Sequence, residues 1–507
     1  MTPDAVRSTD PRLNWTAVGV LVVALAICRV IALQSFPIYD DAFITYRYAE
    51  NLAQGKGLQY NPGAEWEPVL GTTTPLYTLI LSALAAVGLP IVKSSIAFNI
   101  LCESISAVLL AHLLGRRPMV TVIALGAFAA VPQIARIAIG GMEPPLLVAL
   151  ALGAITAAQG GWAFASGVLG GLCCLVRPES LFLLAALAWI QRRDRRALLR
   201  FVLPVVVIGL VSTLTLLQVY GQPIPQSVVA KGKHSTWATK LTRVPEILAQ
   251  GFGPTLPMKL LVPFAALGYL RGLLPASRVR PLLFLGAAMV ASYAFVGTKT
   301  WGWYYYVALV SWCVALGLGL ESVIERVGTL RAAGRGRAVR FALAPALALG
   351  ALGSISWVAT NHKDRITPNV YEPLANWARD ARLGERGVTV LASDIGAIGF
   401  LSGARILDSE GLVWPEALHF AHQCDVLRAH APEYVVWVVN EYRLGRFLAD
   451  PELAARYRPI QRFNENGNGD LHPDPMHLPR SWEQDYLIFE RVDLRTADAS
   501  SHAKRTE

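Results

Sequence analysis

The segment Asp40-Asp41-Ala42-Phe43-Ile44-Thr45-Tyr46-Arg47-Tyr48-Ala49 directly follows an apolar stretch long enough to cross a membrane. That stretch runs from about Trp15 to Leu33, close to the roughly 20 residues that a transmembrane helix needs. Within the quoted segment, aromatic and charged residues alternate too closely for contact with lipid. Because ionised groups are costly at membrane depth, the paired carboxylates favour a wet cavity or a bound ligand over an ordinary helix N-cap.

The composition indicates a polytopic membrane protein. Of the 507 residues, 53% are hydrophobic and only 16% are charged, whereas a soluble domain has about 25% charged residues. The apolar density falls after about Ala359 and leaves roughly 145 residues, enough for one small domain. The net charge of +10 does not indicate nucleic-acid binding, because the basic residues lie in short loops, where they orient a chain across a bilayer.

The chain is expected to divide into a transmembrane domain at 1–360, with a long first external loop at 35–94, an external α/β domain at 361–493 and a disordered tail at 494–507. The α/β expectation rests on alternation of strand-like and helical stretches. These are Val388–Ala392, Pro415–His430, Tyr434–Val439 and Pro451–Arg456. Asp394 and Asp408 in this domain are candidates for acceptor contact, but an Asp close to a Gly is more often a turn residue.

Basic residues set the predicted topology. Arg7 and Arg12 place the N-terminus in the cytoplasm, which puts Asp40 and Asp41 outside. Pro75–Leu89 is expected to be an interfacial helix, because counting it as a span would put Arg116-Arg117 outside. About eleven spans result: Trp15–Leu33, Ser95–Leu114, Val120–Ile139, Pro144–Ala158, Trp162–Val176, Leu181–Ile190, Phe201–Tyr220, Pro257–Leu270, Leu282–Val296, Tyr305–Val323 and Phe341–Ala359.

This topology gathers unusual polar residues on the outer face. They are Asp40, Asp41, Arg47, Glu143, Arg177, Glu179, Lys231, Lys233, His234 and Lys299. Carboxylates beside Lys and Arg suit transfer to a hydroxyl with a phosphate as leaving group, since a carboxylate can accept the hydroxyl proton and cations stabilise the departing phosphate. Each element also has a plainer interpretation. The segment 223–234 can be a solvated basic loop, Arg177-Pro178-Glu179 a helix entry, and the aromatic run 301–306 an interfacial belt.

Several motifs together resemble bacterial glycosyltransferases of the GT-C superfamily, most closely the arabinofuranosyltransferase-like branch, which is related to protein O-mannosyltransferases and aminoarabinose transferases. The first motif is Asp40–Ala49, followed by Asn51-Leu52-Ala53, Gly55-x-Gly57 and Tyr60-Asn61-Pro62-Gly63. The others, in chain order, are Gly141-Met142-Glu143-x-Pro145-Leu146, Tyr220–Pro225 with Ala230-Lys231, Asp394–Phe400, and Asp408-x-x-Gly411-Leu412.

The resemblance implies a polytopic GT-C-like fold and a polyprenyl-phosphate sugar donor, with arabinofuranose as the best guess for the sugar. The acceptor would be a hydroxyl of a cell-envelope glycan or protein, outside the bacterial inner membrane. Asp41 or Asp40 would be the general base and Glu143 the second acidic residue. Expected ligands of the donor phosphate are Lys231, Lys233, His234, Arg177 and Lys299. Expected contacts of acceptor or sugar are Arg47, Tyr46, Glu179, Trp301 and Tyr304.

Two further questions stay open in the sequence. Two or three carboxylates can bind a divalent cation through oxygen, but Lys and Arg can equally neutralise a phosphate without a metal. The alternative function is a transporter or flippase of lipid-linked saccharide. Such proteins commonly contain internal repeats with paired broken helices, whereas this chain has no evident repeat and its unusual polar residues crowd one face.

The topology makes a direct prediction. Arg192–Arg196 and Arg326–Arg340 should be cytoplasmic and the chain after Asn361 external, because positive charge is retained on the cytoplasmic side. Single cysteines introduced near Arg195 should resist an impermeant thiol reagent added to intact cells, while cysteines in the C-terminal domain should react. The reverse labelling pattern would overturn the whole orientation.

Overall fold

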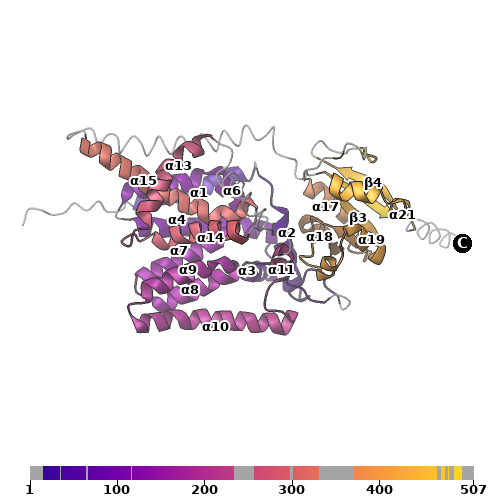
Figure 1. Ribbon diagram of the computed structural model, residues 1–507, viewed down its shortest axis with the longest axis horizontal. Helices are drawn as coiled ribbons and strands as arrows, with labels where there is room; N and C mark the ends of the chain where they lie inside the picture. The colour runs from indigo at the N-terminus through magenta and orange to yellow at the C-terminus, as the bar shows by residue number, and fades with distance from the viewer. Residues whose placement is uncertain are drawn as a thin grey trace, which may run out of the picture.

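The structure is a computed structural model that describes residues 15–34, 36–63, 67–115, 117–232, 256–296, 301–330, 370–464, 470–473, 478 and 485–493. Helices dominate the apolar part of the chain (Figure 1). In order they are α1 (Trp15–Ala32), α2 (Asp40–Ala53), α3 (Pro75–Ala86), α4 (Ile91–Leu114), α5 (Pro118–Ala130), α6 (Pro132–Ile139), α7 (Pro144–Gln159), α8 (Ala163–Val176), η2 (Pro178–Ser180), α9 (Leu181–Gln191), α10 (Arg195–Tyr220), α11 (Gln226–Gly232), α13 (Leu256–Gly272), α14 (Arg280–Val296), η3 (Gly302–Tyr305) and α15 (Tyr306–Leu330).

The helices agree with the predicted spans over the described residues. Each predicted span from Trp15 to Val323 falls on one helix, except that Val120–Ile139 is the pair α5 and α6, bent by 58°. Within the described ranges, four helical stretches are long and apolar enough to cross a membrane, or five if the bent pair is counted. The span Phe341–Ala359 lies outside the described residues. The number of eleven crossings and the side of each loop therefore stay predictions.

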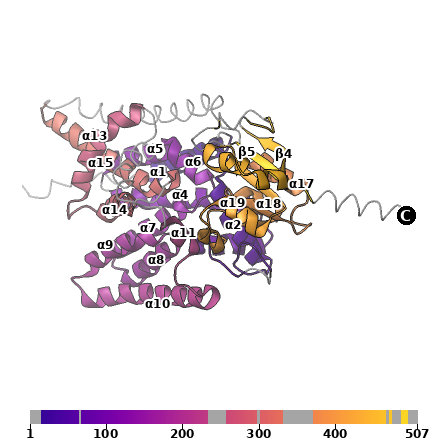
Figure 2. The ribbon, with the colours of Figure 1, turned by 45° about the vertical axis from the view of Figure 1, so that its right-hand side comes forward.

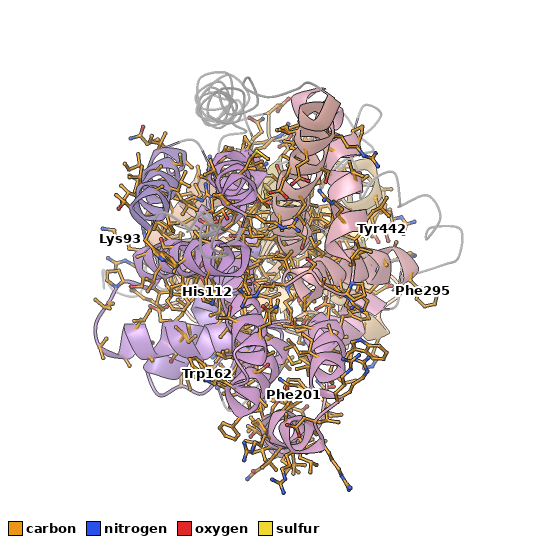
Figure 3. The ribbon with its side chains drawn as sticks, turned by 90° about the vertical axis from the view of Figure 1, so that its left-hand side faces the viewer. Lys93, His112, Trp162, Phe201, Phe295 and Tyr442 are labelled. Atoms are coloured by element: carbon orange, nitrogen blue, oxygen red, sulfur yellow. The ribbon has the colours of Figure 1, made fainter. Side chains whose placement is uncertain are left out.

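Helix α10 is the least buried of the four long apolar helices among the described residues. It lies along one edge of the helical part (Figure 1), and only 11% of its most apolar 18-residue stretch is buried. Leu203, Leu210 and Leu214 are among its exposed side chains. Phe201 is an exception, because it is buried (Figure 3). Here α10 approaches α8 so closely that a Cβ at Gly167 of α8 would collide with the Phe201 carbonyl oxygen. A long helix with so large an apolar exposed face is suited to lipid and not to water.

A buried ion pair joins four helices in the middle of the apolar part. Arg29 of α1 and Glu103 of α4 are fully buried, and the guanidinium Nε lies 2.6 Å from a Glu103 carboxylate oxygen. Arg29 also donates to the carbonyl oxygens of Phe128 and Ala129 in α5. The Tyr306 hydroxyl of α15 donates to Glu103. Charged groups at such depth are tolerated only when paired and fully hydrogen-bonded, as these are.

We expect Glu103→Gln to destabilise the helical part strongly, because it leaves the Arg29 charge buried without a carboxylate. The loss should be about 3–5 kcal/mol, visible as a lower Tm of the purified protein in detergent. Arg117→Gln, which breaks the half-exposed pair with Glu321, is the control and should cost about 0–1 kcal/mol. Equal shifts in Tm for the two variants would contradict this account.

The C-terminal part forms a five-stranded sheet with helices on both faces (Figure 2). Its elements are α17 (Tyr371–Asp380), β1 (Thr389–Ala392), α18 (Gly396–Ser402), β2 (Arg405–Asp408), η4 (Pro415–His419), α19 (Gln423–His430), β3 (Tyr434–Val438), η5 (Glu441–Gly445), α20 (Arg446–Leu448), α21 (Pro451–Arg456), β4 (Tyr457–Phe463) and β5 (Tyr486–Arg491). The strand order is β2-β1-β3-β5-β4. β1 pairs with β2 and β3 in parallel, and β5 pairs with β3 and β4 antiparallel.

Alternate residues of the central strands enter two separate cores, as the two-residue period of a strand requires. Val390 of β1 and Val436 of β3 face a core that α17 and α18 complete. Leu391 and Trp437 face the opposite core, together with side chains of α19 and α21. The first core also contains Ile44, Tyr48 and Tyr60 of the α2 region. The sheet domain and the first loop therefore share one apolar core, although more than 300 residues separate them in the sequence.

Arg47 of α2 fastens the C-terminal domain to this loop. Its guanidinium donates to the carbonyl oxygens of Gly399 at 2.6 Å, Ala404 at 2.7 Å and Tyr60 at 2.7 Å, and it lies 4.2 Å from the centre of the Tyr60 ring. Asn61 exchanges two hydrogen bonds with the backbone of Ile406. A Cβ at Gly399 would collide with the Tyr60 hydroxyl, so glycine is required there for the close approach.

Arg47→Ala should loosen this attachment, because the carbonyl oxygens of Gly399 and Ala404 would lose their bonds to the guanidinium. The Gly399 carbonyl would keep the N–H of Gly403, so the cost of about 1–3 kcal/mol for an unsatisfied buried group applies to Ala404. Hydrogen–deuterium exchange of the full chain should accelerate in α18 and β2, while α4 stays unchanged. Arg428→Ala is the matched control, since Arg428 bonds Asp425 and Asp450 on the exposed side of the same domain. If hydrogen exchange in α18 of Arg47→Ala were as slow as in the wild type, Arg47 would not be what holds the C-terminal domain to the first loop.

Candidate active site

A cavity lies where the helical part, the first loop and the C-terminal domain meet. It encloses about 440 Å³ of space, including the part open to solvent. Its lining residues come from α2, the segment before α3, the start of α7, the end of α8, α11, η3 and the loop after β2. They are Asp41, Ile44, Thr45, Gly71, Thr72, Thr73, Thr74, Met142, Glu143, Arg177, Ser227, Trp303, Tyr304 and Leu412.

The structure separates the two adjacent carboxylates of the first motif. Helix α2 begins at Asp40, and both aspartates occupy its first turn, where the helix dipole favours negative charge. Successive residues of an α-helix point about 100° apart, so Asp40 and Asp41 face different surroundings. Asp41 lines the cavity. Asp40 faces the C-terminal domain.

Asp40 binds the start of helix α18 with both carboxylate oxygens. The backbone N–H of Gly396 donates to one oxygen at 2.8 Å, and that of Ala397 donates to the other at 2.7 Å. Burial, and then the nearby Asp394 carboxylate, raise the pKa of Asp40, while the two N–H groups oppose the rise. Both carboxylate oxygens of Asp40 are therefore engaged by backbone N–H groups, whereas Asp41 lines the cavity.

Glu143 and Arg177 form a buried ion pair in the cavity wall. The Arg177 Nε lies 2.7 Å from a Glu143 carboxylate oxygen, and both side chains are nearly inaccessible. The Arg177 guanidinium also lies 4.4 Å from the centre of the Tyr304 ring. Glu143 immediately precedes α7 and Arg177 immediately follows α8, so antiparallel packing of these helices brings the two together. The charge of Arg177 is therefore largely neutralised by Glu143.

The aromatic run contributes one face of the cavity. Trp303 and Tyr304 line it, and Trp301 stacks on Trp303 with ring centres 5.9 Å apart and planes 10° apart. Trp301 is the more exposed of the two tryptophans. The run is therefore part of the cavity wall and not only a belt at the membrane surface.

Four residues expected to contact sugar or acceptor are not part of the cavity lining: Trp301, which stacks on Trp303, and Arg47, Tyr46 and Glu179. Arg47 is occupied by backbone carbonyls of the C-terminal domain. Tyr46 is fully buried, and its hydroxyl lies 2.6 Å from that of Ser95. Glu179 lies 4.0 Å from Arg177 but is not part of the cavity lining. Arg47 and Tyr46 are therefore both engaged within the fold, and neither lines the cavity.

The expected phosphate ligands are mostly beyond what the structure describes. Lys233, His234 and Lys299 lie outside the described residues, and for Lys231 only the backbone, within α11, is described. Lys231 comes four residues after Ser227 in that helix. Residues four apart lie on the same side of an α-helix, so the position of Lys231 is on the side of α11 that carries Ser227.

The two candidate aspartates of the C-terminal domain, Asp394 and Asp408, have different surroundings. Asp408 accepts backbone N–H groups of Glu410, Leu412 and Val413, which makes it the turn residue that its spacing from Gly411 suggested. Burial raises its pKa to about 7. Asp394 accepts the Tyr486 hydroxyl at 2.7 Å, and burial raises its pKa as well.

Sequence reasoning did not select the hydroxyl-bearing residues of the cavity. Thr72, Thr73, Thr74 and Ser227 line the cavity, but none of them was among the predicted site residues. The available signal was the run of three threonines after Gly71. Gly71 itself is needed because a Cβ there would meet the Leu412 carbonyl oxygen. In the part of the chain that the structure describes, no three His, Cys, Asp or Glu side chains are grouped closely enough to hold a metal ion.

Comparisons with known proteins show the fold. A family model described as a domain of unknown function (DUF8728) matches residues 365–488, the C-terminal sheet domain. No curated protein matches the sequence. The crystal structure of ArnT from Cupriavidus metallidurans in the apo state is similar, with a TM-score of 0.59 and 13% identity, covering 94% of this chain and 98% of that one. The structure of the same protein bound to undecaprenyl phosphate gives 0.55 and 13%, covering 94% and 99%.

The similarity extends over the helical part and the C-terminal domain together. The predicted fold class, a polytopic α-helical membrane protein with a small C-terminal α/β domain, is thereby confirmed, and the chain has the fold of these ArnT structures.

Proposed function

We propose that this protein is a membrane glycosyltransferase that moves a sugar from a polyprenyl-phosphate donor to a hydroxyl group of an acceptor. The observation that carries the proposal is the position of Asp41 in a cavity beside the Glu143–Arg177 pair. That cavity lies where apolar helices meet a polar domain, which suits a reaction between a lipid-linked donor and a water-soluble acceptor. The sequence resemblance to GT-C glycosyltransferases supports the same reaction class.

The donor class has support from two directions. The sequence resemblance implies a polyprenyl-phosphate sugar, and an ArnT structure of the same fold was solved with undecaprenyl phosphate, a polyprenyl phosphate. The apolar exposed face of α10 offers a surface for lipid chains. Arabinofuranose is our choice of sugar and a cell-envelope glycan or protein our choice of acceptor. Both rest on the sequence motifs alone, as does an active site outside the bacterial inner membrane.

In the proposed reaction, the Asp41 carboxylate accepts the proton of the acceptor hydroxyl. The acceptor oxygen forms a bond to the anomeric carbon, and the bond between that carbon and the phosphate oxygen breaks, with the electron pair leaving on the lipid phosphate. Negative charge grows on this phosphate, so it needs a cation nearby. Lys231 in α11 is the first candidate, followed by Lys233, His234 and Lys299. Arg177 is the least available, because Glu143 holds it.

Glu143 has a supporting role in this scheme. Its carboxylate holds Arg177, and the pair adds a hydrogen-bonded polar group to the cavity that contains Asp41 without adding net charge. Breaking such a pair by removing one partner leaves the other charge buried and uncompensated. A divalent cation is not required by this arrangement, although Asp41 and Glu143 supply oxygen atoms of the kind that a hard cation prefers.

The decisive experiment is transfer of radiolabelled arabinofuranose from decaprenyl phosphate to an envelope glycan by the purified protein. Asp41→Asn should lower the rate by about 10²–10⁴, because the variant cannot accept the hydroxyl proton. Asp40→Asn should lower it less, since its role is to hold α18. Glu50→Gln, which changes a carboxylate of α2 outside the cavity lining, is the control and should retain wild-type turnover.

Comparing the turnover of Asp41→Asn and Asp40→Asn identifies which of the two aspartates is the base. Normal turnover by Asp41→Asn would remove the base from this position. A larger loss in Asp40→Asn than in Asp41→Asn, with α18 still protected from hydrogen exchange, would transfer the base to Asp40. An inactive wild-type protein with both pentose and hexose donors would contradict the proposed reaction.

A further inference from the structure

Ser227 has a buried hydroxyl that the fold does not use. The residue is only 3% exposed, and among the described residues its Oγ has no hydrogen-bond partner. It lines the cavity that contains Asp41 and the Glu143–Arg177 pair. A buried hydroxyl without a partner costs about 1–3 kcal/mol, so such groups are rare unless something else satisfies them.

The position of Ser227 is fixed by its neighbour. The backbone N–H of Gln226 donates to the carbonyl oxygen of Leu70 at 2.9 Å, and the Gln226 side chain donates to the carbonyl oxygen of Gly411 at 3.1 Å. These two bonds tie the first turn of α11 to the first loop and to the C-terminal domain. The fold therefore holds Ser227 firmly at the cavity wall while leaving its hydroxyl unsatisfied, which is the pattern of a binding group.

The cavity favours a neutral ligand group beside Ser227. Its charged lining residues are Asp41, Glu143 and Arg177, and the only cation among them is already paired. A phosphate placed there would meet net negative charge, whereas a sugar hydroxyl can both donate and accept a hydrogen bond. Thr72 and Thr74 lie in the same wall with their hydroxyl oxygens 3.0 Å apart. Trp303 and Tyr304 supply the apolar surfaces that the carbon face of a sugar ring needs.

We propose that Ser227 is a sugar-recognition residue, whose hydroxyl binds a hydroxyl group of the sugar carried by the donor lipid. The inference rests on the proposed function and adds a residue to its site. The donor sugar is chosen over the acceptor because Lys231, the first candidate for the phosphate, follows Ser227 by four residues in α11. The sugar attached to that phosphate then lies closest to Ser227.

The test compares two lipids that differ only in the sugar, decaprenyl phosphate and decaprenyl-phosphoryl arabinofuranose, bound to the full chain in nanodiscs. Ser227→Ala should weaken binding of the sugar-bearing lipid about tenfold, the value of one hydrogen bond, and leave the Kd of decaprenyl phosphate unchanged. Ser227→Thr should retain most of the discrimination because it keeps the hydroxyl. Without lipid, the Tm of Ser227→Ala should not fall, since no internal hydrogen bond is lost.

Ser106→Ala is the matched control. Ser106 is equally buried, but its hydroxyl donates to the Cys102 carbonyl oxygen within α4, so its removal should lower the Tm slightly without changing the ratio of the two Kd values. Equal weakening of both lipids by Ser227→Ala would show that the hydroxyl binds phosphate, and unchanged binding of both would show that it binds neither. Either result overturns the inference while Asp41-dependent transfer stands. Failure of the wild type to bind either lipid would contradict the proposed function as well.

Discussion

The attachment of helix α18 to helix α2 is the constraint on which the rest of the site depends. Asp40 accepts two backbone N–H groups at the start of α18, and Arg47 donates to the carbonyl oxygens of Gly399 in the middle of α18 and of Ala404 just after it. Two charged side chains of α2 thus hold the start, the middle and the exit of this seven-residue helix. Because buried backbone groups must be paired, each of these bonds is costly to break. The clamp fixes the orientation of α2, and thereby the direction in which Asp41 points.

The cavity is a product of this junction and belongs to no single domain. Asp41 comes from the clamped helix, Glu143 and Arg177 from two apolar helices, Ser227 from α11, and Leu412 from the C-terminal domain. Its lining combines a carboxylate and a neutralised ion pair with hydroxyl groups and aromatic rings. A cavity assembled in this way is complete only while the C-terminal domain remains docked.

The helices of the apolar part were predictable because their composition alone demands them. A stretch such as Arg195–Tyr220 is too long and too apolar for the surface of a soluble protein, and the helix that forms there exposes its apolar side chains as expected. The strands at Thr389–Ala392 and Tyr434–Val438 were predictable for a related reason, since continuous apolar runs suit strands buried on both faces. The bend of 58° between α5 and α6 was not predicted, although Pro132 at the break was the signal for it.

The sequence by itself determined the class of the protein, the order of its elements and the concentration of unusual polar residues near the first loop. Only the tertiary structure decided what those residues do. Neighbours in sequence, Asp40 and Asp41, serve different partners because a helix turns them about 100° apart and the second partner, α18, lies some 356 residues away. Arg47 is a charged residue of a kind that often binds ligands, but its guanidinium is hydrogen-bonded to carbonyl oxygens of a domain distant in the sequence. Ser227 resembles any loop serine until folding buries its hydroxyl against the cavity without a partner, because burial and hydrogen-bond satisfaction are properties of the assembled chain.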